Sequence, residues 1–258
     1  MICKIADLIT EIPAAGDLVS RCKDYLHQGT ENVDIVIDSD IVHSEMYAGM
    51  SLKGRVYMES ARRFYMKLLE HNGFYLHASA VELDGKAYLF SASSGVGKST
   101  HTRLWQRVFG EKARVFNDDK PALRFLDGKW YAYGTPWCGK DGININMKVP
   151  VAGICFLKQA QENRIRRLSQ PEAAQKIIGQ TLRRFQLEES LNLMLSQVDS
   201  LVKIIPVYEL ENRPEPEAVW LSYETMRRGP ERMILNEQRC NFPPAGGTDD
   251  AVSGCLQK

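Results

Sequence analysis

The order of apolar and polar residues predicts a strand-rich centre flanked by helices. Two Asp-Gly pairs, Asp84-Gly85 and Asp127-Gly128, each lie between runs in which apolar residues alternate with polar ones. An Asp-Gly pair in this setting is a strong signal for a two-residue β-hairpin turn. The strands expected from these turns pair residues 74–83 with 86–92 and residues 120–126 with 129–135.

Helical spacing follows on both sides of this centre. Residues 55–71 place apolar side chains on one helical face, and Asn72-Gly73 is typical of a helix end. Ser169 and Glu172 have the spacing of a capping box, with Pro171 in the first turn. Further helices are expected over residues 172–185, 189–203 and 215–228, and further strands over residues 33–37, 151–157 and 204–210.

The size and composition of the chain predict one large core with a smaller appended lobe. The chain has 258 residues, of which 44% are hydrophobic, and this is enough for one sizeable core. We expect an N-terminal α/β lobe over residues 1–73 and a core over residues 74–228. Residues 229–258 are rich in Gly, Pro and polar residues and predict a disordered tail.

Net charge indicates which partners to expect, and cysteine content indicates the cellular compartment. The formal net charge is +1, so we expect neither a nucleic-acid nor a membrane partner, while a homo-oligomer stays open. The six cysteines form no CxxC pair, which favours reduced thiols in a cytoplasmic protein. The N-terminus has acids where a signal peptide would be apolar.

The stretch from Ala92 to Ser99, ASSGVGKS, lies between a strand-like run and a helix-like run. Small residues there allow successive backbone N–H groups to converge on a phosphate, and the following helix points its positive end at the same place. This pattern predicts a P-loop with Ala in the first position; the alternative is an ordinary turn carrying a surface lysine. The residues expected to bind ATP are Ser94, Gly95, Val96, Gly97, Lys98, Ser99 and Thr100.

A P-loop entered from a tight hairpin changes the expected fold. Common P-loop proteins have a parallel sheet with helical crossovers. Here the strand before the loop is the second arm of a hairpin. We therefore expect an α/β fold with a mixed sheet, antiparallel hairpins flanking the P-loop, and a helical C-terminal part.

The hairpin register carries His77 to the mouth of the loop. If Leu83 faces Lys86, then His77 lies opposite Ala92. A histidine in an apolar strand is often a satisfied core residue. Its position beside the predicted phosphate site favours a functional role instead.

Two adjacent acids end the strand-like run RVFNDD. The second hairpin register places Asp118 and Asp119 near Trp137 and Pro136. As in a Walker B segment, one acid would hold Mg²⁺ together with Ser99, and the other would accept the proton of an attacking hydroxyl. The alternative is a solvated turn.

Lys140, in the segment WCGKDG, is a candidate for a second cation beside the transferred group. A phosphoryl transition state spreads negative charge over three oxygens, and a nearby cation stabilises it. A surface lysine after glycine is the alternative. The following ININ segment offers side-chain amides for a substrate.

The segments LHASAVELDGKAYLFSASSGVGKST and VFNDDKPALR resemble the core of the HPr kinase/phosphorylase family. The resemblance covers roughly residues 74–160 and implies a phosphoenolpyruvate carboxykinase-like P-loop fold. It also implies that Asp118 is the metal-side acid, Asp119 the catalytic base, and His77 the residue positioned near that base. The segment GTPWCGK is similar to one in HPr-kinase-related proteins often encoded beside peptide-maturation enzymes. Thr100 stands where the HPr kinase family typically has Glu.

These features predict a kinase that uses ATP and Mg²⁺ to phosphorylate a hydroxyl. The acceptor would be a serine of a peptide or protein, or a small metabolite. The alternative is a nucleotide-binding regulatory or scaffold subunit of a modification complex with little turnover. A scaffold needs the phosphate loop but no catalytic base, so Asp119 discriminates between the two.

Overall fold

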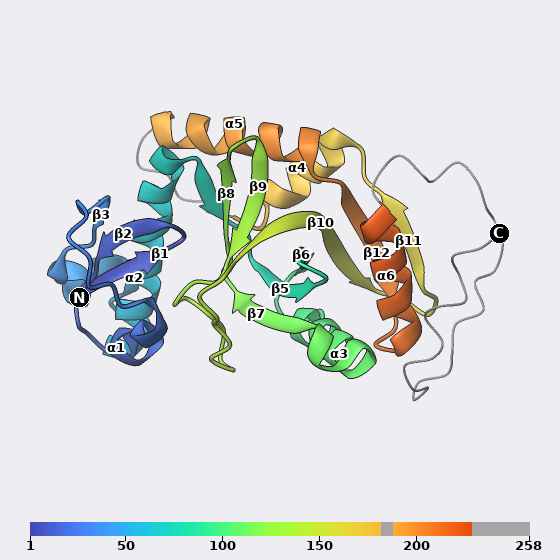
Figure 1. Cartoon of the computed structure of the whole chain (residues 1–258), viewed down its shortest axis with the longest axis horizontal. Coiled ribbons are helices and arrows are strands. Elements are labelled where there is room, and N and C mark those ends of the chain that lie inside the picture. Colours follow the sequence, from blue (N-terminus) through green and yellow to red (C-terminus); the bar gives the residue numbers. More distant parts are fainter. Residues whose placement is uncertain (182–187, 229–258) are drawn as a thin grey trace.

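The computed structural model describes residues 1–181 and 188–228 (Figure 1). Its strands are β1 Ile2–Ile5, β2 Leu8–Glu11, β3 Ile35–Val36, β4 Gly73–Tyr75, β5 Ala78–Leu83, β6 Lys86–Ser91, β7 Arg114–Asp119, β8 Ala122–Leu126, β9 Lys129–Tyr133, β10 Lys148–Gln159, β11 Arg164–Arg167 and β12 Val207–Asn212. Its α-helices are α1 Leu18–Arg21, α2 Leu52–Leu68, α3 Lys98–Phe109, α4 Gln170–Ile178, α5 Glu188–Ile204 and α6 Pro216–Arg228. Short 3₁₀ helices cover Lys23–Tyr25, Ser39–His43, Glu45–Tyr47, Leu69–His71 and Gly110–Lys112.

The fold is mixed α/β, built on a large curled sheet in which β10 joins two halves (Figure 1). The first residues of β10 pair antiparallel with β9, and later residues pair parallel with β6 and β12. A register shift between Val151 and Gly153 marks a β-bulge at the change of partner. A bulge bends a strand and increases its twist, so it contributes to the curl. The expectation of a mixed sheet is confirmed.

Both predicted hairpins form with the predicted registers. Leu83 pairs with Lys86, and Leu126 pairs with Lys129. The turn residues Asp84 and Gly85 have φ of +53° and +71°. In the second turn, Asp127 and Gly128 have φ of +50° and +76°. Positive φ at both central positions is what a type I′ turn requires, and Asp-Gly tolerates it well.

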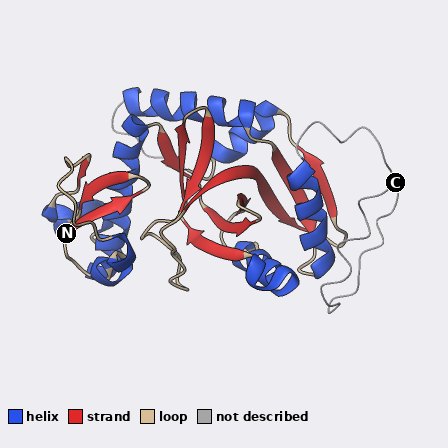
Figure 2. Ribbon diagram, viewed as in Figure 1, coloured by secondary structure: helices blue, strands red, loops and turns tan. Residues whose placement is uncertain are grey.

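Helices cover both faces of the sheet (Figure 2), which explains why four consecutive residues of β6, from Ala87 to Phe90, are apolar and buried. Ala87 and Leu89 pack into the cluster that includes α4 and α5. Tyr88 and Phe90 point the other way, into the cluster with α3 and α6. Successive side chains of a strand alternate between faces, so a strand buried on both sides needs apolar residues at consecutive positions.

The N-terminal segment forms a small sheet of β1, β2 and β3 beside α2 (Figure 1). Its apolar side chains share a cluster with Tyr133 and Trp137 of the central region. The domain boundary expected near residue 73 stays a prediction. The shared cluster contains side chains from both sides of this boundary. Within the described residues, no helix is both long and apolar enough to cross a membrane.

Trp137 links α2 to the central sheet, and its loss is expected to destabilise the fold strongly. The side chain is fully buried, lies 4.7 Å from the ring of Phe64, and donates a 3.0 Å hydrogen bond to Ser60. Trp137→Ala should lower the free energy of unfolding by about 3–5 kcal/mol, as for other buried aromatic truncations. Urea denaturation checks this, with the partly exposed Trp220→Ala as the control; equal losses in both variants would contradict the packing role.

Three sequence expectations need correction or fall outside the described residues. The strand expected over 74–83 is divided, because β4 pairs with β8 while β5 pairs with β6 and β7. The capping box at Ser169 and Glu172 is present, but α4 ends at Ile178 rather than continuing to residue 185. The expected disordered tail, residues 229–258, lies outside the described residues.

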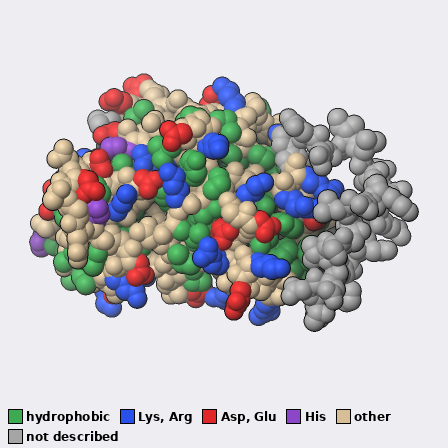
Figure 3. All heavy atoms as spheres, in the orientation of Figure 1, with side chains coloured by type: hydrophobic (Ala, Val, Ile, Leu, Met, Phe, Trp, Pro, Cys, Tyr) green, Lys and Arg blue, Asp and Glu red, His purple; other side chains and the backbone are tan. Residues whose placement is uncertain are grey.

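Charged side chains of both signs are intermingled on the face shown in Figure 3. This distribution agrees with a formal net charge of +1 for the whole chain.

Candidate functional site

The loop between β6 and α3 has a backbone conformation that depends on its two glycines. Gly95 has φ +82° and Gly97 has φ +116°, values that residues with a side chain rarely adopt. A Cβ atom at either position would meet nothing within 4 Å. Conformational freedom, not close packing, therefore explains both glycines. The loop enters α3 at Lys98, in the strand–loop–helix order that the sequence predicted.

Lys98 and Ser99 turn toward the body of the protein at the start of α3. Lys98 Nζ donates a 3.0 Å hydrogen bond to the carbonyl oxygen of Ala92. Burial lowers the pKa of Lys98, and the neighbouring charges of Asp119 and Asp118 oppose this. Of the other residues predicted at the loop, Val96 is partly buried, and Ser94, Gly95 and Thr100 are exposed.

The end of β7 places its two acids on different sides of the site. Asp118 is buried, and its Oδ2 accepts a 2.8 Å hydrogen bond from the Ser99 hydroxyl. Asp119 is the last residue of β7 and has φ +133°, a backbone conformation that costs a non-glycine residue about 1–3 kcal/mol. Its backbone lies between Ala78 of β5, with which it pairs, and Cys138, with which it forms a bridge.

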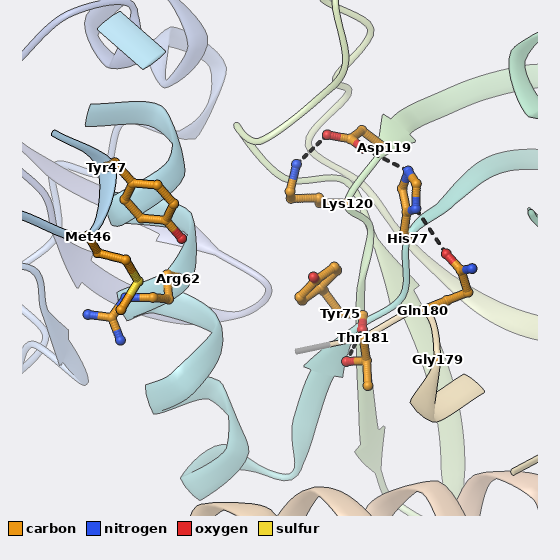
Figure 4. Close-up of a pocket in the computed structure, with 10 residues that line it drawn as sticks. All are labelled: Met46, Tyr47, Arg62, Tyr75, His77, Asp119, Lys120, Gly179, Gln180 and Thr181. Carbon is orange, nitrogen blue, oxygen red and sulfur yellow. Dashed lines mark hydrogen bonds and ion pairs between the residues drawn. The ribbon is translucent and has the colours of Figure 1, made fainter. Parts of the chain in front are cut away.

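His77 lies between Asp119 and Gln180, as Figure 4 shows. Its Nε2 is 3.3 Å from Asp119 Oδ1, and its Nδ1 is 3.0 Å from Gln180 Oε1. The His77 backbone N–H also donates a 2.7 Å hydrogen bond to the Gln180 carbonyl oxygen. The structure thus brings His77 and Asp119 together, as the first hairpin register predicted.

The Asp119 carboxylate is also contacted by two residues that sequence reasoning missed. Its Oδ2 accepts hydrogen bonds from the Tyr57 hydroxyl, at 3.1 Å, and from Lys120 Nζ. Burial acts to raise the pKa of Asp119, but the His77 hydrogen bond and the Lys120 charge hold it well below its ordinary value. Asp119 is therefore ionised at neutral pH.

The register expected for Asp118 and Asp119 is wrong by two residues. Asp119 forms a bridge with Cys138, not with Pro136, and β9 ends at Tyr133 before reaching β7. The segment after Pro136 still folds back beside the two acids, because the Gly139 N–H donates to the Asp118 carbonyl oxygen. The pairing arithmetic failed because β7 pairs with β5 and is not an extension of the β8–β9 hairpin.

Lys140 is not brought into the group of residues around Asp119. It is exposed on a turn, and no ion pair involving Lys140 is found within residues 1–181 and 188–228. Lys120 is the lysine that contacts Asp119. The amides of the ININ segment are used within the protein, since Asn144 donates to the Arg21 carbonyl oxygen at 2.9 Å and Asn146 to that of Asp24 at 3.0 Å.

A pocket of about 400 Å³ opens beside Asp119 (Figure 4). Polar groups line one part of it, and Met46, Tyr47 and Tyr75 line another. Met46 and Tyr47 belong to the N-terminal segment, whereas His77 and Asp119 belong to the central sheet. The full lining consists of Met46, Tyr47, Arg62, Tyr75, His77, Asp119, Lys120, Gly179, Gln180 and Thr181.

The oxygen atoms of Ser99 and Asp118 suit a magnesium ion. Mg²⁺ prefers oxygen ligands and is usually bound by one or two protein side chains together with substrate phosphates and water. No group of three or more His, Cys, Asp or Glu residues with metal-site geometry is present in the described part of the chain. One hydroxyl and one carboxylate are too few for an all-protein metal site, so a metal bound there would take its remaining oxygen ligands from another molecule.

Sequence signals for the missed residues are weak. Lys120 follows directly after the two acids in NDDK, so proximity alone was a usable signal. Tyr57 comes from α2 and Gln180 from the turn after α4, and both are far from the acids in sequence. Only the tertiary packing brings them to Asp119 and His77.

Comparisons with known proteins identify a family and show a distant structural likeness. The family model described as "SynChlorMet cassette protein ScmC" matches residues 54–213, more than half of the chain. A search of curated proteins found no match. Among solved structures, the chain is similar to "Structure of the Hpr(Ser) kinase/phosphatase from Coxiella burnetii", with 13% identity, a TM-score of 0.34, and coverage of 60% of this chain and 88% of that chain.

Proposed function

This chain belongs to the SynChlorMet cassette protein ScmC family, and we propose that it is a kinase that uses ATP and Mg²⁺ to phosphorylate a hydroxyl. The acceptor is a serine of a peptide or protein, or a small metabolite. The proposal includes the P-loop identity of residues 92–99 and a phosphoenolpyruvate carboxykinase-like fold, both carried by the sequence motifs.

The observation that carries the proposal is that two adjacent aspartates at the end of β7 have different contacts. Asp118 accepts a hydrogen bond from Ser99, at the start of α3. Asp119 contacts His77 and lines the pocket. Two adjacent carboxylates thus serve two neighbouring spaces, as a phosphoryl transferase needs for its nucleotide-bound metal and for its acceptor.

The loop residues have distinct roles in binding the nucleotide. Backbone N–H groups around Gly95 and Gly97 surround the phosphates, and the positive end of α3 favours their negative charge. Lys98 exchanges its hydrogen bond with Ala92 for one with the β/γ-phosphates. Ser99 and Asp118 would hold Mg²⁺, which would supply positive charge to the phosphate oxygens.

The transfer itself needs one base and one bond exchange. The acceptor oxygen forms a bond to the γ-phosphorus while the bond from that phosphorus to the β,γ-bridging oxygen breaks, leaving ADP. Asp119 accepts the proton of the acceptor hydroxyl and later releases it to solvent. Because the pKa of Asp119 is low, this proton transfer occurs late, when the acceptor oxygen is already bonding to phosphorus and has become acidic. His77 orients the carboxylate.

Nucleotide binding should depend on the metal. Isothermal titration of the wild-type chain with ATP should show at least about tenfold tighter binding with Mg²⁺ than with EDTA. The reason is that Ser99 and Asp118 contact the nucleotide only through the bound Mg²⁺. Ser99→Ala should reduce this difference. ATP binding that is indifferent to Mg²⁺ would contradict the assigned metal site, and absence of binding would contradict the proposed function.

A further inference from the structure

Asp119 stands between two spaces with different chemistry. On the loop side lies Ser99, which donates a 2.8 Å hydrogen bond to Asp118, the residue before Asp119. On the other side lie Lys120, which pairs with Asp119, and the pocket of about 400 Å³. If the loop side takes the nucleotide, as the proposed function requires, the pocket is the space left for the acceptor.

The hydrogen bonds of Asp119 indicate which of its oxygens is available to an acceptor. Oδ2 already accepts from Tyr57 and Lys120. Oδ1 is contacted by His77 alone among the described residues. A carboxylate oxygen accepts two hydrogen bonds, so Oδ1 keeps a place for the hydroxyl of a bound molecule.

Charge in the pocket argues against a polyanionic acceptor. Its cationic side chains already have carboxylate partners, since Arg62 donates to Glu59 at 2.9 and 2.7 Å and Lys120 pairs with Asp119. A sugar phosphate or a second nucleotide would need cations that are not already neutralised. The pocket is therefore suited to an acceptor without strong negative charge.

The wall opposite His77 and Gln180 consists of Met46, Tyr47 and the Glu59-paired Arg62. Figure 4 shows Met46 and Tyr47 on one side of the pocket, facing His77 and Gln180 on the other, with Tyr75 between them. Tyrosine and methionine side chains bind apolar and aromatic bodies well. The volume is near the lower end for ligand pockets, so it accommodates one or two residues or a small molecule but not the surface of a folded domain.

We infer that this pocket is the acceptor site and that it takes an alcohol attached to a compact apolar or aromatic group, selected by Tyr47. The hydroxyl binds at Asp119 Oδ1, and the apolar group packs against Met46 and Tyr47. The alcohol is supplied either by a free small molecule or by a side chain with its neighbour in a peptide. The N-terminal segment thereby determines acceptor specificity.

The test uses two matched pairs of probes with the full chain. The peptide pair is N-acetyl-Ser-Phe-amide and N-acetyl-Ser-Gly-amide, and the free pair is 2-phenylethanol and ethanol. Binding is measured without nucleotide by ligand-observed NMR titration. Transfer from Mg-ATP is measured separately, and the Kd of Mg-ATP is recorded for every variant. Pocket binding without any transfer would refute the proposed kinase while leaving the pocket assignment intact.

The aromatic member of at least one pair should bind about tenfold or more tightly than its partner. Tyr47→Ala should abolish this preference by raising the KM of the aromatic probe, whereas Tyr47→Phe should retain the preference. Met50→Ala, at an exposed position, is the control and should behave as wild type. A preference seen in the peptide pair alone identifies a peptide acceptor. A preference seen in the free pair identifies a small-molecule acceptor. No preference in either pair, or a preference that survives Tyr47→Ala, would overturn the inference even if Mg-ATP binds and is hydrolysed.

Discussion

Asp119→Asn should bind Mg-ATP about as well as the wild-type chain and yet transfer phosphate about 10²–10⁴-fold more slowly, the loss typical of a missing general base. Asparagine has nearly the shape of aspartate and keeps a carbonyl oxygen for His77 or Lys120 to contact. It cannot accept the proton of the acceptor hydroxyl. Binding is measured by isothermal titration and transfer by release of labelled γ-phosphate into the product.

Two further variants make this result specific. His77→Ala should show a smaller loss in the same step, because His77 orients the carboxylate and does not accept the proton. Asp141→Asn is the matched control, since Asp141 pairs with Arg103 on the surface. Wild-type rates for both Asp119→Asn and His77→Ala would refute the assigned roles. Loss of Mg-ATP binding in Asp119→Asn would exchange the roles of Asp118 and Asp119.

Lys98→Ala should weaken ATP binding by a few kcal/mol, on the order of a charged hydrogen bond. In the free protein Lys98 Nζ donates to one carbonyl oxygen, that of Ala92, so its removal should cost little stability. In the complex it would leave the β/γ-phosphates without their lysine. Isothermal titration checks the affinity, and Lys86→Ala, at an exposed position next to the first hairpin turn, is the control. Unchanged ATP affinity in Lys98→Ala would refute the P-loop assignment.

The parts of the fold that could be predicted are those fixed by short-range chemistry. Asp84-Gly85 adopts positive φ at both positions, and this turn alone sets the register that brings His77 beside the loop. Gly95 and Gly97 also have positive φ, as the loop pattern required. Local rules sufficed because each of these features depends on a few adjacent residues.

The N-terminal hairpin shows where local signals fail. Its turn residues Ala6 and Asp7 have φ of +52° and +62°, the same conformation as an Asp-Gly turn but with a residue that rarely adopts it. Burial of the strand side chains against α2 compensates for this conformation. A propensity-based reading therefore sees no hairpin in residues 1–11.

The candidate site was predictable in its acids and loop but not in the groups around them. Lys140 was expected as the second cation from its place in the WCGKDG segment, and that segment does lie beside the acids through the Asp119–Cys138 bridge, but Lys140 itself is exposed on a turn. Tyr57 of α2 contacts Asp119, and Gln180, two residues beyond α4, contacts His77, although both are far from these residues in sequence. Such convergence is decided by tertiary packing, which a single sequence does not specify.

The alternative role as a nucleotide-binding scaffold differs from the kinase in one respect. A scaffold would bind Mg-ATP through residues 92–99 without needing a base at Asp119. Its affinity for nucleotide would respond to Lys98→Ala, but Asp119→Asn would change no reaction rate. The two variants together therefore separate binding from chemistry.

The most direct measurement of the central claim is ³¹P NMR of the wild-type chain incubated with Mg-ATP and the hydroxyl probes described above. The account predicts a new phosphate-ester resonance that grows in step with ADP for at least one probe, and that is absent or strongly reduced with Asp119→Asn. Nucleotide binding without any ester from the whole probe set, or an ester formed equally fast by Asp119→Asn, would contradict it.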